Sequence, residues 1–101
     1  MTKHYLVSGR VQGVGFRMFI EKRARQVGVG GRIRNLKDGR VEIVASGQDA
    51  DVLQLEVYIK RGPDSGQVTQ VEDFVVKDQL NLPLKFTVTP DGDAPWSYDY
   101  A

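Results

Sequence analysis

Two different spacings of apolar residues divide the first third of this chain. Between residues 4 and 11 polar and apolar positions alternate with period two, which predicts a strand. From residue 16 to residue 27 the apolar positions return every three or four residues, as on one face of an amphipathic helix. Glycines at 28, 30 and 31 end this helix, since glycine is the usual residue just past a helix C-terminus.

The rest of the chain continues with strands and one further helix. Asp38-Gly39 between two β-prone runs predicts a hairpin, and Gly62-Pro63 stops a helix introduced by residues 47–51. That helix is expected to end at Lys60-Arg61. Strands are expected at about residues 31–36, 40–46, 67–76 and 84–89, with a polar stretch containing Pro83 before the last strand.

This order predicts an α+β fold: a ferredoxin-like two-layer sandwich, βαββαβ, with an antiparallel sheet and two helices on one face. Residues 1–101 are expected to form a single domain, with a core at about 4–89 and a C-terminal extension at 90–101. That extension is either loose or folded back on the body through its aromatic residues.

The third strand, at residues 40–46, alternates clearly enough to assign its faces. Its apolar set is expected to face inward and its polar set outward: Val41, Ile43 and Ala45 against Arg40, Glu42 and Ser46. His4, near the chain start, is expected to be an exposed strand residue and is given no role in chemistry.

The amino-acid composition argues against several classes of function. With 14 Lys and Arg against 13 Asp and Glu, the net charge of +1 argues against a dedicated nucleic-acid binder. The sequence has no cysteine, which excludes disulfides, thiol catalysis and cysteine-based metal sites. It also has no signal peptide and no apolar run long enough to span a bilayer, so a cytoplasmic protein is expected.

Glycines gather where the first strand gives way to the first helix. Residues 9–15 contain three glycines, and Arg17 follows two positions later. A glycine-rich turn followed by a helix start presents unpaired backbone N–H groups and a partial positive charge, which together favour an anion. The expected phosphate-binding residues are Gln12, Gly13, Val14, Gly15 and Phe16, through their amides, and Arg17, through its guanidinium.

Two segments resemble the signatures of a known family. Residues 9–17 (GRVQGVGFR) resemble the first signature of the acylphosphatase family, and residues 31–42 (GRIRNLKDGRVE) resemble its second. Gly62-Pro63, residues 67–71 and Phe86 are similar to a weaker C-terminal pattern, so the resemblance covers about residues 5–89. The chain departs from the family at Arg32, where an aromatic residue is usual, and in its extension.

This resemblance implies a small ferredoxin-like domain that hydrolyses the carboxyl–phosphate bond of acyl phosphates. It implies that Arg17 binds the substrate phosphate and that Asn35 positions the attacking water, with neither a metal nor an organic cofactor. The expected partner is a small-molecule acyl phosphate, with phosphate or another oxyanion at the loop, and the protein is expected to be a monomer. The two signatures must then converge at one end of the sheet, with Asn35 facing the Arg17 loop.

Two alternatives remain open. The same strand order occurs in RNA-binding domains, but the strand that would present stacking aromatics reads Arg40-Val41-Glu42-Ile43-Val44 and has none. The chain could also resemble the acylphosphatase-like domain at the start of larger hydrogenase-maturation proteins, which would handle carbamoyl phosphate. Because the sequence ends at Ala101, a stand-alone enzyme is the favoured interpretation.

Overall fold

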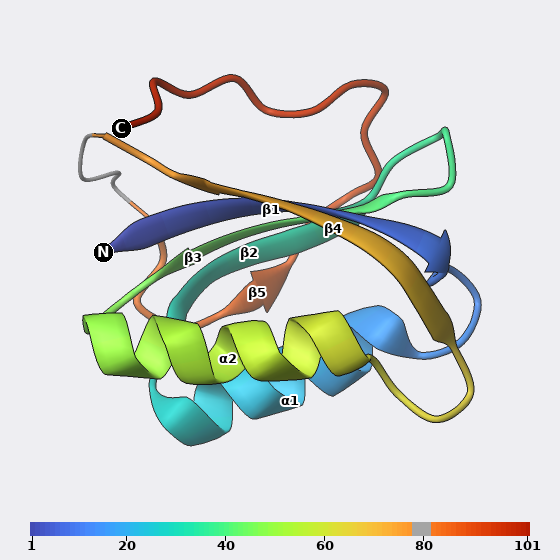
Figure 1. Cartoon of the computed structure of the whole chain (residues 1–101), viewed down its shortest axis with the longest axis horizontal. Coiled ribbons are helices and arrows are strands. Elements are labelled where there is room, and N and C mark those ends of the chain that lie inside the picture. Colours follow the sequence, from blue (N-terminus) through green and yellow to red (C-terminus); the bar gives the residue numbers. More distant parts are fainter. Residues whose placement is uncertain (78–81) are drawn as a thin grey trace.

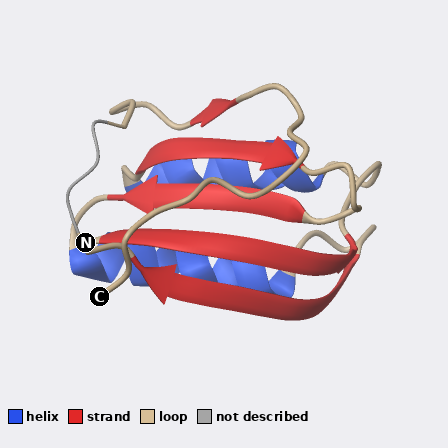
Figure 2. Ribbon diagram, turned by 90° about the horizontal axis from the view of Figure 1, so that it is seen from above, coloured by secondary structure: helices blue, strands red, loops and turns tan. Residues whose placement is uncertain are grey.

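A five-stranded sheet in the order β4-β1-β3-β2-β5 carries both helices on one face (Figures 1 and 2). The structure is a computed structural model that describes residues 1–77 and 82–101. Its elements are β1 (Thr2–Arg10), α1 (Phe16–Val27), β2 (Gly30–Asn35), β3 (Val41–Ser46), α2 (Asp49–Arg61), β4 (Gln67–Val75) and β5 (Thr87–Val88).

The first four strands pair as the sequence predicts. β1 lies antiparallel between β3 and β4, and β2 lies antiparallel to β3 on its other side. This arrangement confirms the predicted α+β ferredoxin-like sandwich. The predicted hairpin turn is also present, since Asp38 accepts hydrogen bonds from the side chain and backbone of Arg40, which lower the pKa of its carboxyl group.

The fifth strand differs from its prediction. β5 covers Thr87–Val88 rather than residues 84–89, and it runs parallel to β2, so the sheet is mixed at this edge rather than wholly antiparallel. Pro90 follows closely and has no N–H with which to extend the ladder. The polar stretch expected before this strand falls largely on residues 78–81, outside the described residues.

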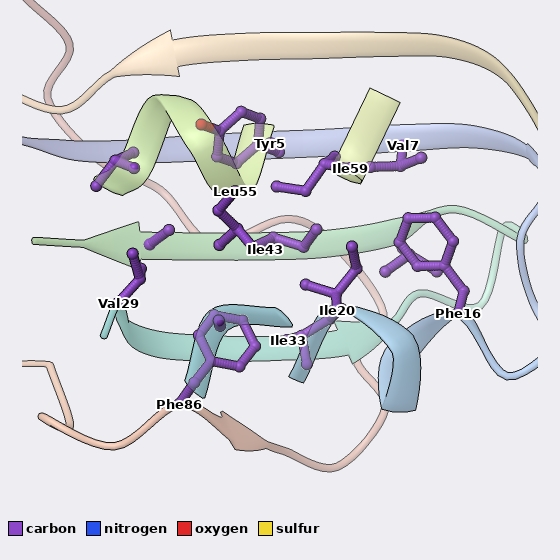
Figure 3. Packing of buried hydrophobic residues seen from close by; sticks show 14 of the residues in the cluster. Tyr5, Val7, Phe16, Ile20, Val29, Ile33, Ile43, Leu55, Ile59 and Phe86 are labelled. Carbon is purple, nitrogen blue, oxygen red and sulfur yellow. The ribbon is translucent and has the colours of Figure 1, made fainter. Parts of the chain in front are cut away.

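The layer between the sheet and the helices is the apolar core. Figure 3 shows side chains of both layers meeting there, such as Ile43 from β3, Ile20 from α1 and Leu55 from α2. The inward set predicted for β3 is confirmed, because Val41, Ile43 and Ala45 are all fully buried. Burying a side chain such as isoleucine or leucine contributes about 1.5–3 kcal/mol, so this layer is the main source of stability.

The face of the sheet away from the helices, here called the outer face, is covered as well. Residues 90–101 run across it, as Figure 2 shows from above, so the extension folds back on the body. The predicted exposure of His4 is wrong, since its side chain is buried, and Glu42 points outward as expected but is also fully buried. Both residues lie under a segment whose path the strand pattern did not specify.

Glu42 is accommodated by three hydrogen bonds. Its carboxylate accepts from His4 Nε2 at 2.6 Å, from Arg34 Nε at 2.8 Å and from the backbone N–H of Trp96 at 2.7 Å. Burial alone would raise the pKa of Glu42, but these hydrogen bonds outweigh it and lower that pKa. Within the described residues, neither helix is long and apolar enough to cross a membrane.

Candidate active site

The loop between β1 and α1 has the geometry of an anion-binding turn. Gly13 and Gly15 have positive φ angles of 72° and 76°, which favour glycine over residues that carry a Cβ atom. Among residues 1–77 and 82–101, no side chain caps the start of α1, and the first turn of this helix contains no acidic residue. The N–H groups and the partial positive charge at this helix end therefore remain available to a ligand.

Arg17 and Asn35 come together beside this loop. A cavity of about 120 Å³ lies among Val11, Gly13, Gly15, Phe16, Arg17, Met18 and Asn35. Arg17 reaches it from the first turn of α1, and Asn35 from the last position of β2. The first and second signature segments therefore meet at one end of the sheet, and both predicted catalytic residues line one cavity.

The Asn35 side chain carries a buried acceptor atom. Its residue is 9% exposed, and its Oδ1 atom is buried with no hydrogen-bond partner among the described residues. Leaving a buried carbonyl oxygen unpaired costs about 1–3 kcal/mol, so such atoms are rare outside functional sites. A donor that enters the cavity, such as a water molecule, would satisfy it.

Gln12 and Val14 occupy the loop without lining the cavity. The Gln12 side chain donates to the carbonyl oxygens of Leu36 and Arg40, at 2.7 and 2.9 Å, and so ties the loop to the β2–β3 hairpin. The Val14 side chain packs against the core, and its carbonyl accepts from Ser65 Oγ at 2.7 Å. These contacts fix the loop relative to Asn35; the role of Ser65 had no signal in the sequence.

Residues 90–101 also reach this site, which the sequence did not indicate. Asp91 Oδ1 lies 3.6 Å from Arg17 Nη1, with the two side chains 64% and 38% exposed. The N–H of Gly92 donates to the Asn35 carbonyl at 3.0 Å, and its carbonyl accepts from the Lys37 N–H at 3.0 Å. The extension thus contacts both predicted catalytic residues.

Arg32, the departure from the family pattern, faces away from the cavity. Its Nη2 atom donates to the Tyr98 hydroxyl at 2.9 Å, and its guanidinium lies 4.2 Å from the centre of the Trp96 ring. Its substitution therefore alters the outer face rather than the rim of the site. Arg34 and Arg10 are also absent from the cavity lining, since Arg34 pairs with Glu42 and Arg10 donates to the Ser65 carbonyl.

A larger cavity, of about 370 Å³, lies elsewhere, at the C-terminal end of α1 and residues 84–86. Its lining is mostly apolar, and Arg25, which lies at its edge, already donates to the Phe86 carbonyl. Neither Arg17 nor Asn35 lines this larger cavity. The smaller cavity is the candidate site because donors and an unpaired acceptor converge on it.

A family model and the sequences of known proteins were compared with this chain, and the matches agree with one another. The family model described as Acylphosphatase matches residues 3–86. An acylphosphatase of Koribacter versatilis is 52% identical over 81 residues, which are 80% of this chain and 74% of that protein. An acylphosphatase of Marinobacter nauticus is 47% identical over 84 residues, which are 83% of this chain and 87% of that protein.

Solved structures show the same fold. A crystal structure of acylphosphatase from Bacillus subtilis superposes with a TM-score of 0.82 at 31% identity, covering 87% of this chain and 97% of that one. HypF from T. kodakarensis superposes with a TM-score of 0.72 at 30% identity, covering 94% of this chain but only 12% of that one. The fold thus occurs both as almost a whole protein and as a small part of a long chain.

Proposed function

The chain belongs to the acylphosphatase family of hydrolases, and on this premise we propose that Arg17, the 12–16 loop and Asn35 carry out its reaction without a metal or organic cofactor. The substrate is a small acyl phosphate, and the products are a carboxylate and inorganic phosphate. The observation that supports these roles best is the shared cavity, which is lined by Arg17 and by Asn35, whose buried Oδ1 atom has no hydrogen-bond partner in the described part of the chain.

The phosphoryl group is held by the loop and by Arg17. The guanidinium offers two parallel N–H groups to two phosphate oxygens, and backbone N–H groups at the loop and the start of α1 bind the phosphate oxygens as well. Hydrogen bonds to charged groups contribute about 1.5–3 kcal/mol each, so several of them suffice to bind phosphate selectively. These donors also stabilise charge that shifts over the phosphoryl oxygens during transfer.

Asn35 positions the water. Its Oδ1 accepts a hydrogen bond from a water molecule in the cavity, which orients the water oxygen toward phosphorus. As the new O–P bond forms, the bond from phosphorus to the carboxyl oxygen breaks, and the carboxylate leaves with the bonding electrons. A phosphate oxygen of the substrate takes the proton from water. An aspartate at position 35 would repel the phosphate, whereas an asparagine carries no charge.

The test is hydrolysis of a model acyl phosphate, benzoyl phosphate, in excess chelator. We expect Arg17→Ala to reduce kcat/KM by roughly 100-fold or more, and Arg17→Lys to fail as well, because an ammonium group cannot form the paired contact. Asn35→Ala should reduce kcat by roughly 100-fold while phosphate still binds. Full activity in either alanine variant would refute the assigned role.

Arg23→Ala is the matched control on the same helix. The Arg23 guanidinium lies over the Tyr58 ring, 4.6 Å from its centre, and not at the cavity. This variant should hydrolyse benzoyl phosphate at the wild-type rate. A phenyl phosphate ester serves as the substrate control, since its cleavage at an equal rate would mean that the reaction class is wrong.

We further propose a monomeric, cytoplasmic protein in which residues 1–101 act as one domain, with a core at about 4–89 and an extension at 90–101. The net charge of +1 supports the absence of nucleic-acid and membrane partners. Light scattering tests the oligomeric state. A salt-sensitive shift with single-stranded RNA would overturn the charge argument.

A second candidate function follows from the likeness to HypF, in which this fold is a small part of a long chain. As such a domain, the protein would handle carbamoyl phosphate within a multistep synthesis. Comparing benzoyl, acetyl and carbamoyl phosphate separates the two functions. Broad hydrolysis supports the stand-alone enzyme, whereas activity confined to carbamoyl phosphate supports the second candidate.

A further inference from the structure

Residues 90–101, here called the clasp, lie beyond the residues that the family model matches, yet they hydrogen-bond to the strand end that carries Asn35. In Figure 1 the clasp is the red segment that crosses the sheet on the side away from the helices. Its two ends therefore do different things: residues 90–93 contact the site, and residues 94–101 contact the outer face.

Gly92 gives the end of β2 a second neighbour. On one side, Asn35 pairs with Val41 of β3. On the other, β5 pairs only with Arg32 and Ile33, so that Asn35 would lie at an open edge without the clasp. The Gly92 N–H and carbonyl close this edge by bonding to Asn35 and Lys37, each at 3.0 Å.

Gly92 lies so close to the Arg34 guanidinium that a side chain at position 92 would displace it. A Cβ atom at position 92 would lie 2.2 Å from Arg34 Nη1 and 2.4 Å from its Cζ atom. Gly92 is thus packed directly against the side chain that precedes Asn35 along the chain. Arg34 in turn donates to the Ala94 carbonyl at 2.8 Å, so the clasp is bonded to β2 at Gly92 and again at Ala94.

Trp96 anchors the clasp to the outer face. The guanidinium groups of Arg32 and Arg34 lie over its ring, 4.2 and 3.9 Å from the ring centre, and its backbone N–H donates to buried Glu42. Cation–π contacts of this kind contribute more when partly shielded from water. The anchor is therefore tied to the same strand, β2, whose end carries Asn35.

We propose that the clasp is a positioning device for the reaction: Trp96 holds Gly92 in place, and Gly92 fixes the backbone from which the Asn35 side chain projects. The inference rests on the proposed role of Asn35. A water-orienting group loses most of its effect when displaced by about 1 Å, which can cost roughly 100-fold in rate. Gln12, by contrast, holds the loop to the hairpin through its own hydrogen bonds, so the clasp should affect phosphate binding only weakly, through the exposed Asp91–Arg17 pair.

If the clasp positions Asn35 and not the phosphate, Trp96→Ala should change kcat without changing KM to the same extent. With benzoyl phosphate, kcat should fall roughly 10- to 100-fold, while KM and the inhibition constant of inorganic phosphate stay within about threefold. Trp96→Phe, which keeps an aromatic ring over the arginines, should recover kcat to within about threefold of wild type. Trp96→Leu should lie between Phe and Ala, and it replaces Ala as the test if Ala does not fold.

Two results would overturn the proposal: a wild-type kcat in the leucine and alanine variants, or kcat and phosphate affinity falling together. Amide hydrogen exchange supplies a readout that does not require activity. In Trp96→Ala or Trp96→Leu, exchange should accelerate at the Gly92 and Lys37 amides but not at the core strand β1. If the wild type hydrolyses no acyl phosphate, the proposed function fails, and unchanged exchange at Gly92 would refute the clasp separately.

Discussion

Glu42 and Ile43 are neighbours on β3 and both are fully buried, but different parts of the chain cover them. Ile43 faces the helices and packs among apolar side chains (Figure 3). Glu42 faces the clasp, where its carboxylate oxygens accept hydrogen bonds from three donors. Apolar packing tolerates exchanges of similar volume, whereas a buried hydrogen-bonded network depends on every member. Equal burial on the two faces of the sheet therefore implies unequal tolerance to substitution.

The two faces also differ in what they position. The apolar face fixes the helices, and with them Arg17 on the first turn of α1. The outer face fixes the clasp, and with it the neighbours of Asn35. Each proposed catalytic residue thus depends on a different face of the same sheet, and mutations can separate the two.

Glu42→Gln should have the largest effect on stability. Glutamine has one acceptor oxygen where glutamate has two, and its NH₂ group would face another hydrogen-bond donor. Arg34 would also lose its counter-charge. Removing one partner of a buried ion pair costs roughly 3–5 kcal/mol, which urea unfolding at pH 7 would measure. The exposed Glu72 on β4 supplies the control, since Glu72→Gln should change the free energy of unfolding by less than about 0.5 kcal/mol.

The pH dependence of unfolding checks the same contact. The pKa of Glu42 in the folded state lies below its ordinary value of 4.5. Its contribution to stability is therefore fully present above that value and is lost as the pH falls through the lower folded pKa. The wild type should lose stability more steeply than Glu42→Gln below about pH 4.5. Parallel curves would show that the carboxylate does not stabilise the outer face.

Ile43→Val, one residue along, should cost only about 0.5–1.5 kcal/mol, because it removes a single methylene from an apolar layer that can partly close around it. Thermal and urea unfolding would measure the loss, and kcat with benzoyl phosphate should remain at the wild-type value. A loss larger than that of Glu42→Gln would reverse the comparison between the two faces.

The sequence predicted the helix face well and the outer face poorly, for a physical reason. Alternation along residues 40–46 assigns Glu42 to one side of a strand, but it carries no information about what covers that side. The cover comes from residues 90–101, which have no periodicity and are held by hydrogen bonds and cation–π contacts specific to Trp96, Tyr98 and Tyr100. Only the aromatic content of this segment suggested that it could fold back.

The candidate site also combines residues that the sequence predicted with residues that it did not. The glycine loop with Arg17 and the segment with Asn35 could be identified from their residues, and the strand order accounts for their meeting at one end of the sheet. The contacts of Asp91 and Gly92 with the site could not be predicted, since an Asp-Gly pair after Pro90 indicates only a turn. Their positions follow from where the clasp is anchored, many residues away from either signature.

Asp91→Asn should have the smallest effect and tests how the clasp influences Arg17. The Asp91 carboxylate lies 3.6 Å from Arg17 Nη1 in an exposed pair, where it competes with phosphate for the guanidinium. Its neutralisation should lower the phosphate inhibition constant by about two- to threefold at low salt, and the effect should vanish at high salt. Asp93→Asn removes the same charge two positions on, where Asp93 pairs with Lys37 at 2.7 Å, and should leave the constant almost unchanged. Equal effects in both variants would mean that the clasp acts on phosphate only through its overall charge, and that Asp91 is no specific competitor for Arg17.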